Sequence, residues 1–142
     1  MRHYKLIGLM ATILLLSSCS VMCPKKINLK DTVWTAQYGV FVADAGTITC
    51  TLTLSFPSAN TFKLVTSSYL PPHPSMAIGP DGKVEMMPAS SSEFTEEGTW
   101  TFKKDILYLH INDGPTKELI YRDGAFESQE RTDTGTYKFT KQ

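Results

Sequence analysis

The chain has 142 residues, which suits one domain, and its 14 basic and 14 acidic residues leave no formal net charge at pH 7. The first 18 residues contain Arg2 and Lys5 but no acidic residue, so the remainder carries 12 basic and 14 acidic residues. No basic stripe is available to neutralise a phosphate backbone, and we therefore expect no nucleic acid partner.

The N-terminal segment predicts a secretory signal. Arg2, His3 and Lys5 form a positive start, and residues 6–16 form an apolar run of eleven residues. A transmembrane helix needs about 20 apolar residues. The run is therefore too short to span a bilayer and suits the apolar core of a signal peptide.

The end of this segment, Leu16-Ser17-Ser18-Cys19, resembles the lipobox of bacterial lipoproteins. The resemblance implies cleavage before Cys19 and acylation of that cysteine on its sulfur and its freed amine, which together give stable membrane anchoring. We therefore expect a lipoprotein signal peptide over residues 1–18 and a lipidated tether over residues 19–30. An ordinary signal peptide with an unrelated cysteine is the alternative. Ser20 is compatible with sorting to the outer membrane, and the leader lacks the acidic run that resembles a surface-export signal in Bacteroidetes. We therefore expect a cell-envelope protein that is lipid-anchored in the outer membrane and faces the periplasm.

Two further cysteines, Cys23 and Cys50, would lie in an oxidising compartment. A disulfide between them is one possibility. The other is a buried thiol, because Cys50 falls on the apolar phase of a predicted strand.

From residue 31 onward the sequence predicts one strand after another. The clearest, over residues 47–56, places apolar side chains at every even position and threonine or serine at every odd one. A period of two indicates a half-buried strand. Other strands are expected over residues 33–42, 61–70, 98–103, 106–112, 117–122, 125–128 and 135–141.

Residues 31–142 are therefore expected to form an all-β domain, an antiparallel up-and-down, lipocalin-like barrel of eight or nine strands, because closure removes exposed sheet edges. A β-sandwich is the alternative. The longer excursion between residues 69 and 94 contains the turn at residues 79–82 and could form an extra hairpin. Glu93, Glu96 and Glu97 are interpreted as a solvated turn before the next strand.

One pattern occurs twice, T-x-x-G-T-aromatic-x-F, at residues 95–102 and 132–139. The glycines, Gly98 and Gly135, are expected to permit a bend or bulge where the chain enters a strand. We interpret the repeat as a recurring way of starting a strand and not as a repeated site.

The segments TLTLSF, TFKLVTSSYL and FTEEGTWTFKKDILYL, within residues 47–109, resemble the small lipoprotein barrels typified by the N-terminal domain of NlpE. The chain is also similar to the lipocalin-like lipoproteins of Bacteroidetes. Both resemblances imply a barrel. The NlpE family carries a C-x-x-C pair before its threonine-rich strand, whereas residues 42–49 contain no cysteine here, so the resemblance does not carry a copper role over to this chain.

Enzymatic motifs are missing from the sequence. It contains no G-x-S-x-G, no H-E-x-x-H and no phosphate-binding glycine loop. We therefore expect no enzymatic activity and no cofactor.

The excursion offers a possible metal site. His73, Met76, Met86 and Met87 lie in or beside it, and imidazole and thioether groups are soft ligands suited to Cu(I). The alternative is a mobile rim loop whose methionines only pack.

Aromatic residues suggest a second site. Trp34, Tyr69 and Trp100 are expected to bind a small apolar ligand at the open end of the barrel, unless they merely fill a closed core. The sequence thus predicts a lipid-anchored, non-enzymatic envelope protein that binds a small apolar ligand or a protein partner at the barrel mouth. A role in envelope stress or assembly, or in periplasmic copper handling, is the alternative.

Overall fold

The computed structural model describes residues 26–142, apart from the side chain of Met76. The predicted signal peptide, Cys19 and Cys23 lie outside this range. Residues 26–142 form ten strands, and they include no helix long and apolar enough to cross a membrane.

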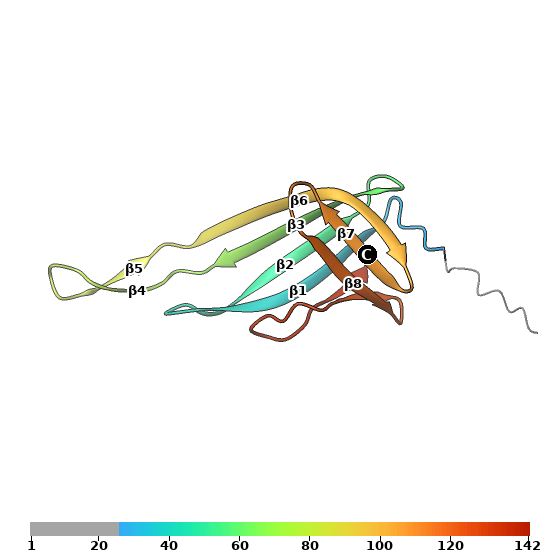
Figure 1. The fold of residues 1–142 in the computed structure, drawn as a ribbon. Coiled ribbons are helices and arrows are strands. Elements are labelled where there is room, and N and C mark those ends of the chain that lie inside the picture. Colours follow the sequence, from blue (N-terminus) through green and yellow to red (C-terminus); the bar gives the residue numbers. More distant parts are fainter. Residues whose placement is uncertain (1–25) are drawn as a thin grey trace, which may run out of the picture.

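Eight strands form a closed antiparallel barrel in the order β1-β10-β9-β8-β7-β6-β3-β2 (Figure 1). They are β1 (Val33–Val42), β2 (Gly46–Ser55), β3 (Thr61–Leu70), β6 (Ser90–Lys103), β7 (Ile106–Ile111), β8 (Thr116–Arg122), β9 (Ala125–Ser128) and β10 (Lys138–Lys141). With β4 and β5 left out, strands that are consecutive in the sequence are neighbours in the barrel. Strand β1 pairs with β10 and so closes the barrel. The predicted antiparallel up-and-down barrel is confirmed, and the β-sandwich alternative is wrong.

The core follows the alternation expected from the sequence. In β2, Cys50, Leu52 and Leu54 are buried, whereas the threonines between them are only partly covered. The interior is filled by large side chains with less than 2 % of their surface exposed: Phe56, Phe62, Phe126, Phe139, Leu29, Leu54, Leu64, Leu107 and Leu109.

The beginning of the described chain closes one end of the barrel. Leu29 is buried in the core and Ile27 packs against it. The Asp31 amide donates to the Phe56 carbonyl at 2.8 Å, and the Thr32 amide donates to the Leu29 carbonyl at 3.0 Å. Residues 27–30, predicted as the end of the tether, therefore belong with the barrel, because the Ile27 and Leu29 side chains pack with its core.

The excursion between β3 and β6 is an ordered ribbon. Its strands β4 (His73–Ile78) and β5 (Val84–Met87) form a separate two-stranded sheet that prolongs the β3–β6 hairpin. We call residues 69–94 the arm. In Figure 1 the arm projects far beyond the barrel, on the side opposite to the start of the described chain. The expected extra hairpin is confirmed.

The two glycines of the repeated pattern serve different purposes. A Cβ atom on Gly98 would lie 1.9 Å from the His110 carbonyl oxygen, so glycine is required for the close approach of β6 and β7. Gly135 instead adopts a φ of 101° in the tight turn that pairs it with Thr132. Gly98 also lies well inside β6, because this strand begins at Ser90 and not at residue 98 as predicted.

Candidate functional site

The structure does not bring the three predicted ligand-binding aromatics together. Trp34 is 4 % exposed and meets the Phe126 ring edge-on at 4.7 Å. Trp100 packs against the core, with its ring 5.6 Å from that of Phe56. Tyr69, in contrast, is 58 % exposed on the arm. The two tryptophans therefore help to fill the barrel, and only Tyr69 is available to a partner.

The metal set is divided between two faces of the arm. His73 lies directly opposite Met87, whereas Met86 lies opposite Pro74. Cross-strand partners share a face and successive residues alternate between faces, so Met86 lies on the face away from His73 and Met87. Met76 lies in β4, where the register shifts. Only His73 and Met87 are therefore shown as neighbours.

The surroundings of His73 offer little else to a metal ion. Its Nδ1 atom lies 3.0 Å from the Pro71 carbonyl oxygen, which occupies one ring nitrogen. Within residues 26–142, no three or more side chains of His, Cys, Asp or Glu gather as a possible metal site.

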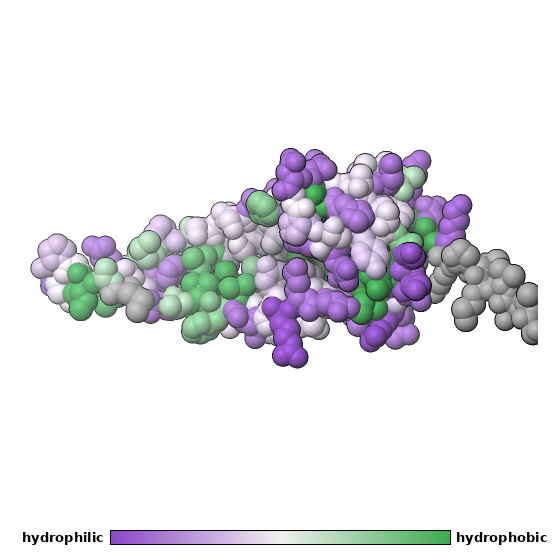
Figure 2. Space-filling model, in the orientation of Figure 1, coloured by the Kyte–Doolittle hydropathy of each residue, from purple (hydrophilic) through white to green (hydrophobic). Residues whose placement is uncertain are grey.

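Exposed apolar side chains are concentrated on the arm. Figure 2 shows hydrophobic surface at the tip of the arm and again nearer the barrel, where the β1–β2 hairpin also lies. The large apolar residues of the arm that are 45–70 % exposed are Tyr69, Ile78, Val84, Met86, Met87 and Phe94. Large apolar patches on ordered surfaces commonly mark interaction sites.

A polar cluster lies inside the barrel at the end that carries the arm. Glu96 is paired with Leu64, and Lys117 is paired with Leu109, so both charged side chains share the inward face with buried leucines. The Lys117 ammonium lies 2.8 Å from the Glu96 carboxylate, and these side chains are only 24 % and 15 % exposed. This ion pair closes the arm end of the barrel with charged side chains, whereas the apolar side chain of Leu29 closes the opposite end.

Two tyrosines continue this cluster. The Tyr38 and Tyr137 rings stack at 5.5 Å, and the Tyr137 hydroxyl donates to the Glu130 carboxylate at 3.5 Å. Burial raises the pKa of Tyr137 and that of Tyr38 above their ordinary value, and Cys50 adds to the rise for Tyr38. Both hydroxyls are therefore held in their protonated form well above neutral pH.

Sequence reasoning missed this cluster because it placed the three glutamates in a turn. The structure corrects that interpretation, since Glu93, Glu96 and Glu97 all lie within β6. A signal was available, because Glu96 has the same parity as Trp100 and Phe102, which pack against the core.

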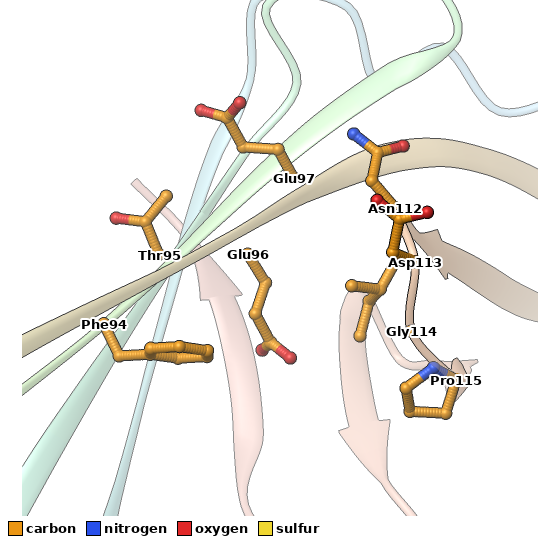
Figure 3. Close-up of a pocket in the computed structure, with 9 residues that line it drawn as sticks. Phe94, Thr95, Glu96, Glu97, Asn112, Asp113, Gly114 and Pro115 are labelled. Atoms are coloured by element: carbon orange, nitrogen blue, oxygen red, sulfur yellow. The ribbon is translucent and has the colours of Figure 1, made fainter.

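An open groove of about 560 Å³ lies between β6 and the β7–β8 turn (Figure 3). Its lining residues are Phe94, Thr95, Glu96, Glu97, Ile111, Asn112, Asp113, Gly114 and Pro115. In Figure 3, Phe94 and Glu96 extend from one face of β6, and Thr95 and Glu97 extend from the other. The groove thus combines an aromatic ring, several carboxylates and the edge of a strand.

Cys50 is buried on the inward face of β2, opposite Tyr38, and carries no disulfide within the described part of the chain. Its proposed partner, Cys23, lies outside that part, so the disulfide stays a prediction.

Comparisons with protein-family models, with curated proteins and with solved structures find no match to this chain.

Proposed function

We propose that this chain is a lipid-anchored, non-enzymatic protein of the bacterial cell envelope that binds a protein partner through its arm. The observation that carries the proposal is the exposure of Tyr69, Ile78, Val84, Met86, Met87 and Phe94 over the two faces of one ribbon. An isolated two-stranded ribbon is only marginally stable in water. Contact with a partner would both cover these side chains and stabilise the ribbon.

A protein partner is favoured over a small apolar ligand because the barrel has a filled interior. The side chains at its centre, among them Phe62 and Phe126, expose 2 % of their surface or less. A hollow barrel would expose such residues to an internal cavity. Among the described residues, six of the eight exposed large apolar side chains lie instead on the arm, and the other two are Val33 and Phe41.

The anchoring part of the proposal is supported by the apolar run of residues 6–16 and by Leu16-Ser17-Ser18-Cys19. The described chain starts at the end of the barrel away from the arm (Figure 1). With a lipid on Cys19, the arm would therefore extend from the membrane-proximal barrel into the periplasm.

Photo-crosslinking in intact cells tests the proposal. A photoreactive residue would replace Ile78 or Met86 on the arm in the full-length protein, and Ala59, in the exposed β2–β3 turn at the far end of the barrel, would be the matched control site. We expect one discrete crosslinked protein from each arm position and none from position 59. Crosslinking that is absent, or equal at all three positions, would reject arm-mediated binding.

A further inference from the structure

Among residues 26–142, no strand pairs with the outer edge of β6 along residues 90–97. On one side, this segment pairs with β3 in continuous register from Thr61–Thr99 to Leu70–Ser90. On the other side, β7 pairs with β6 only from Gly98 to Lys103, and the chain then turns away at Asn112. The groove of Figure 3 lies along the edge that β7 leaves uncovered.

The backbone groups that face this groove can be identified. The Asn112 amide donates to the Glu97 carbonyl at 2.9 Å, so the backbone of Glu97 faces the β7 side. Backbone groups alternate between the two sides of a strand. Thr95 therefore presents its N–H and C=O groups to the groove, and Ser91 and Glu93 present theirs along the same edge beyond the groove.

Proteins usually protect an exposed edge with proline, lysine, a bulge or a covering segment. Residues 90–97 contain no proline and no lysine, and their pairing with β3 shows no shift in register. Charged side chains also protect edges, and the glutamates of this segment are its remaining protection, so the edge is open only to a strand of complementary charge.

The charge along the β6 edge decides which kind of strand would pair with it. Between residues 90 and 102 the only charged side chains are Glu93, Glu96 and Glu97, and Asp113 lies across the groove. Lys117 neutralises Glu96 at 2.8 Å, whereas Lys63 is 3.9 Å from Glu97 in a half-exposed pair of little strength. A second copy of this edge would place glutamates opposite glutamates, which is unfavourable. A basic segment is complementary.

We propose that the β6 edge over residues 90–97 accepts an extended, basic segment of a partner protein as an added antiparallel strand. The added strand would continue the line of β7, with backbone hydrogen bonds to Ser91, Glu93 and Thr95 and an apolar side chain against Phe94 and Ile111. Strand addition is a common mode of peptide recognition. This inference rests on the proposed function only in taking the partner to be a protein.

The test measures the affinity of the full chain for two synthetic eight-residue peptides, one of alternating lysine and valine and one of alternating glutamate and valine. We expect the basic peptide to bind and the acidic peptide to bind at least about tenfold more weakly. Amide hydrogen exchange of Ser91, Glu93 and Thr95 should slow when the basic peptide is present.

Thr95→Pro separates strand addition from simple charge attraction. The Thr95 amide faces the groove, so proline there leaves the β3 pairing intact but removes one donor and obstructs an incoming strand. We expect a loss of affinity of about tenfold, whereas Thr95→Ala, which keeps the amide, should bind as the wild type does. Combined Glu93→Lys and Glu97→Lys should reverse the preference between the peptides.

Three outcomes would overturn the inference: equal affinity for both peptides, unchanged binding by Thr95→Pro, or a concentration-dependent dimer that Thr95→Pro abolishes. The last would assign the edge to a second copy.

Peptide binding that persists while crosslinking from Ile78 and Met86 is absent would reject the arm as a docking site and leave strand addition standing. Crosslinking without peptide binding would reject strand addition alone.

Discussion

Gly98 lies where β6 and β7 approach most closely. A Cβ atom there would meet the His110 carbonyl oxygen at 1.9 Å, and this oxygen belongs to the backbone and cannot move aside freely. We expect Gly98→Ala to lower the free energy of unfolding by about 2–3 kcal/mol, as overpacking does. Urea unfolding measures the loss. Thr99→Ala, at the exposed neighbouring position, is the control and should stay within about 0.5 kcal/mol of the wild type.

Tyr137 predicts how stability depends on pH in the alkaline range. Burial raises the pKa of its hydroxyl above the ordinary 10.0, with the Glu130 carboxylate adding to the rise. The folded state therefore holds this proton more tightly than the unfolded state. Its contribution to stability is fully present below pH 10.0 and is lost as the pH rises from there through the raised pKa of the folded state.

Urea midpoints measured from neutral pH to above pH 10 test this expectation. Tyr137→Phe should flatten the alkaline decline, because it removes a proton that only the unfolded state releases easily. Tyr108→Phe takes a hydroxyl from the outer face of β7 and serves as the control. A decline of the same steepness in Tyr137→Phe and the wild type would contradict the role assigned to Tyr137.

At the scale of elements, the arm should be separable from the barrel. Leu70 and Ser90 are cross-strand partners, so Asn-Gly in place of residues 71–89 would close a two-residue hairpin between them. The removed strands contribute no residue to the buried core. We expect the free energy of unfolding to change by about 0.5 kcal/mol or less, and co-purification of the protein identified by crosslinking from Ile78 or Met86 to disappear. A large loss in urea unfolding would show that the arm supports the barrel.

The arrangement of the arm also argues against the predicted copper site. His73 and Met87 share a face, and Met86 lies on the other, so the predicted ligands are not gathered around one point. We expect the wild type not to compete with a Cu(I) chelator. Stoichiometric Cu(I) binding that His73→Ala abolishes would contradict this expectation and favour copper handling.

For the molecule as a whole, Cys19 predicts that the barrel is anchored to a membrane through lipid on this residue. Cys19→Ala should leave an unprocessed or soluble protein, because cleavage and acylation both require the thiol. Labelling with a radioactive fatty acid, followed by membrane fractionation, measures the change. A variant that still takes up label and stays with the membrane would rule out anchoring through this cysteine.

Particular residues show how far the sequence could predict this molecule. The alternation around Leu52 and Leu54 predicted a strand with one buried face, and the structure confirms it. The same reasoning placed Leu29 in a tether, because Ile27 and Leu29 are too few apolar residues to establish a period. Glu96 was assigned to a turn because its partner, Lys117, is distant in sequence and joins it only through the barrel.

The sequence by itself determined that residues 31–142 form antiparallel strands, because a period of two and turn signals are local properties of the chain. Only the tertiary structure decided which side chains share a space. Closure of the barrel buries Trp34, brings Glu96 to Lys117 and leaves the β6 edge without a partner. These results depend on register and on where each strand stops pairing, which follow from contacts between distant segments.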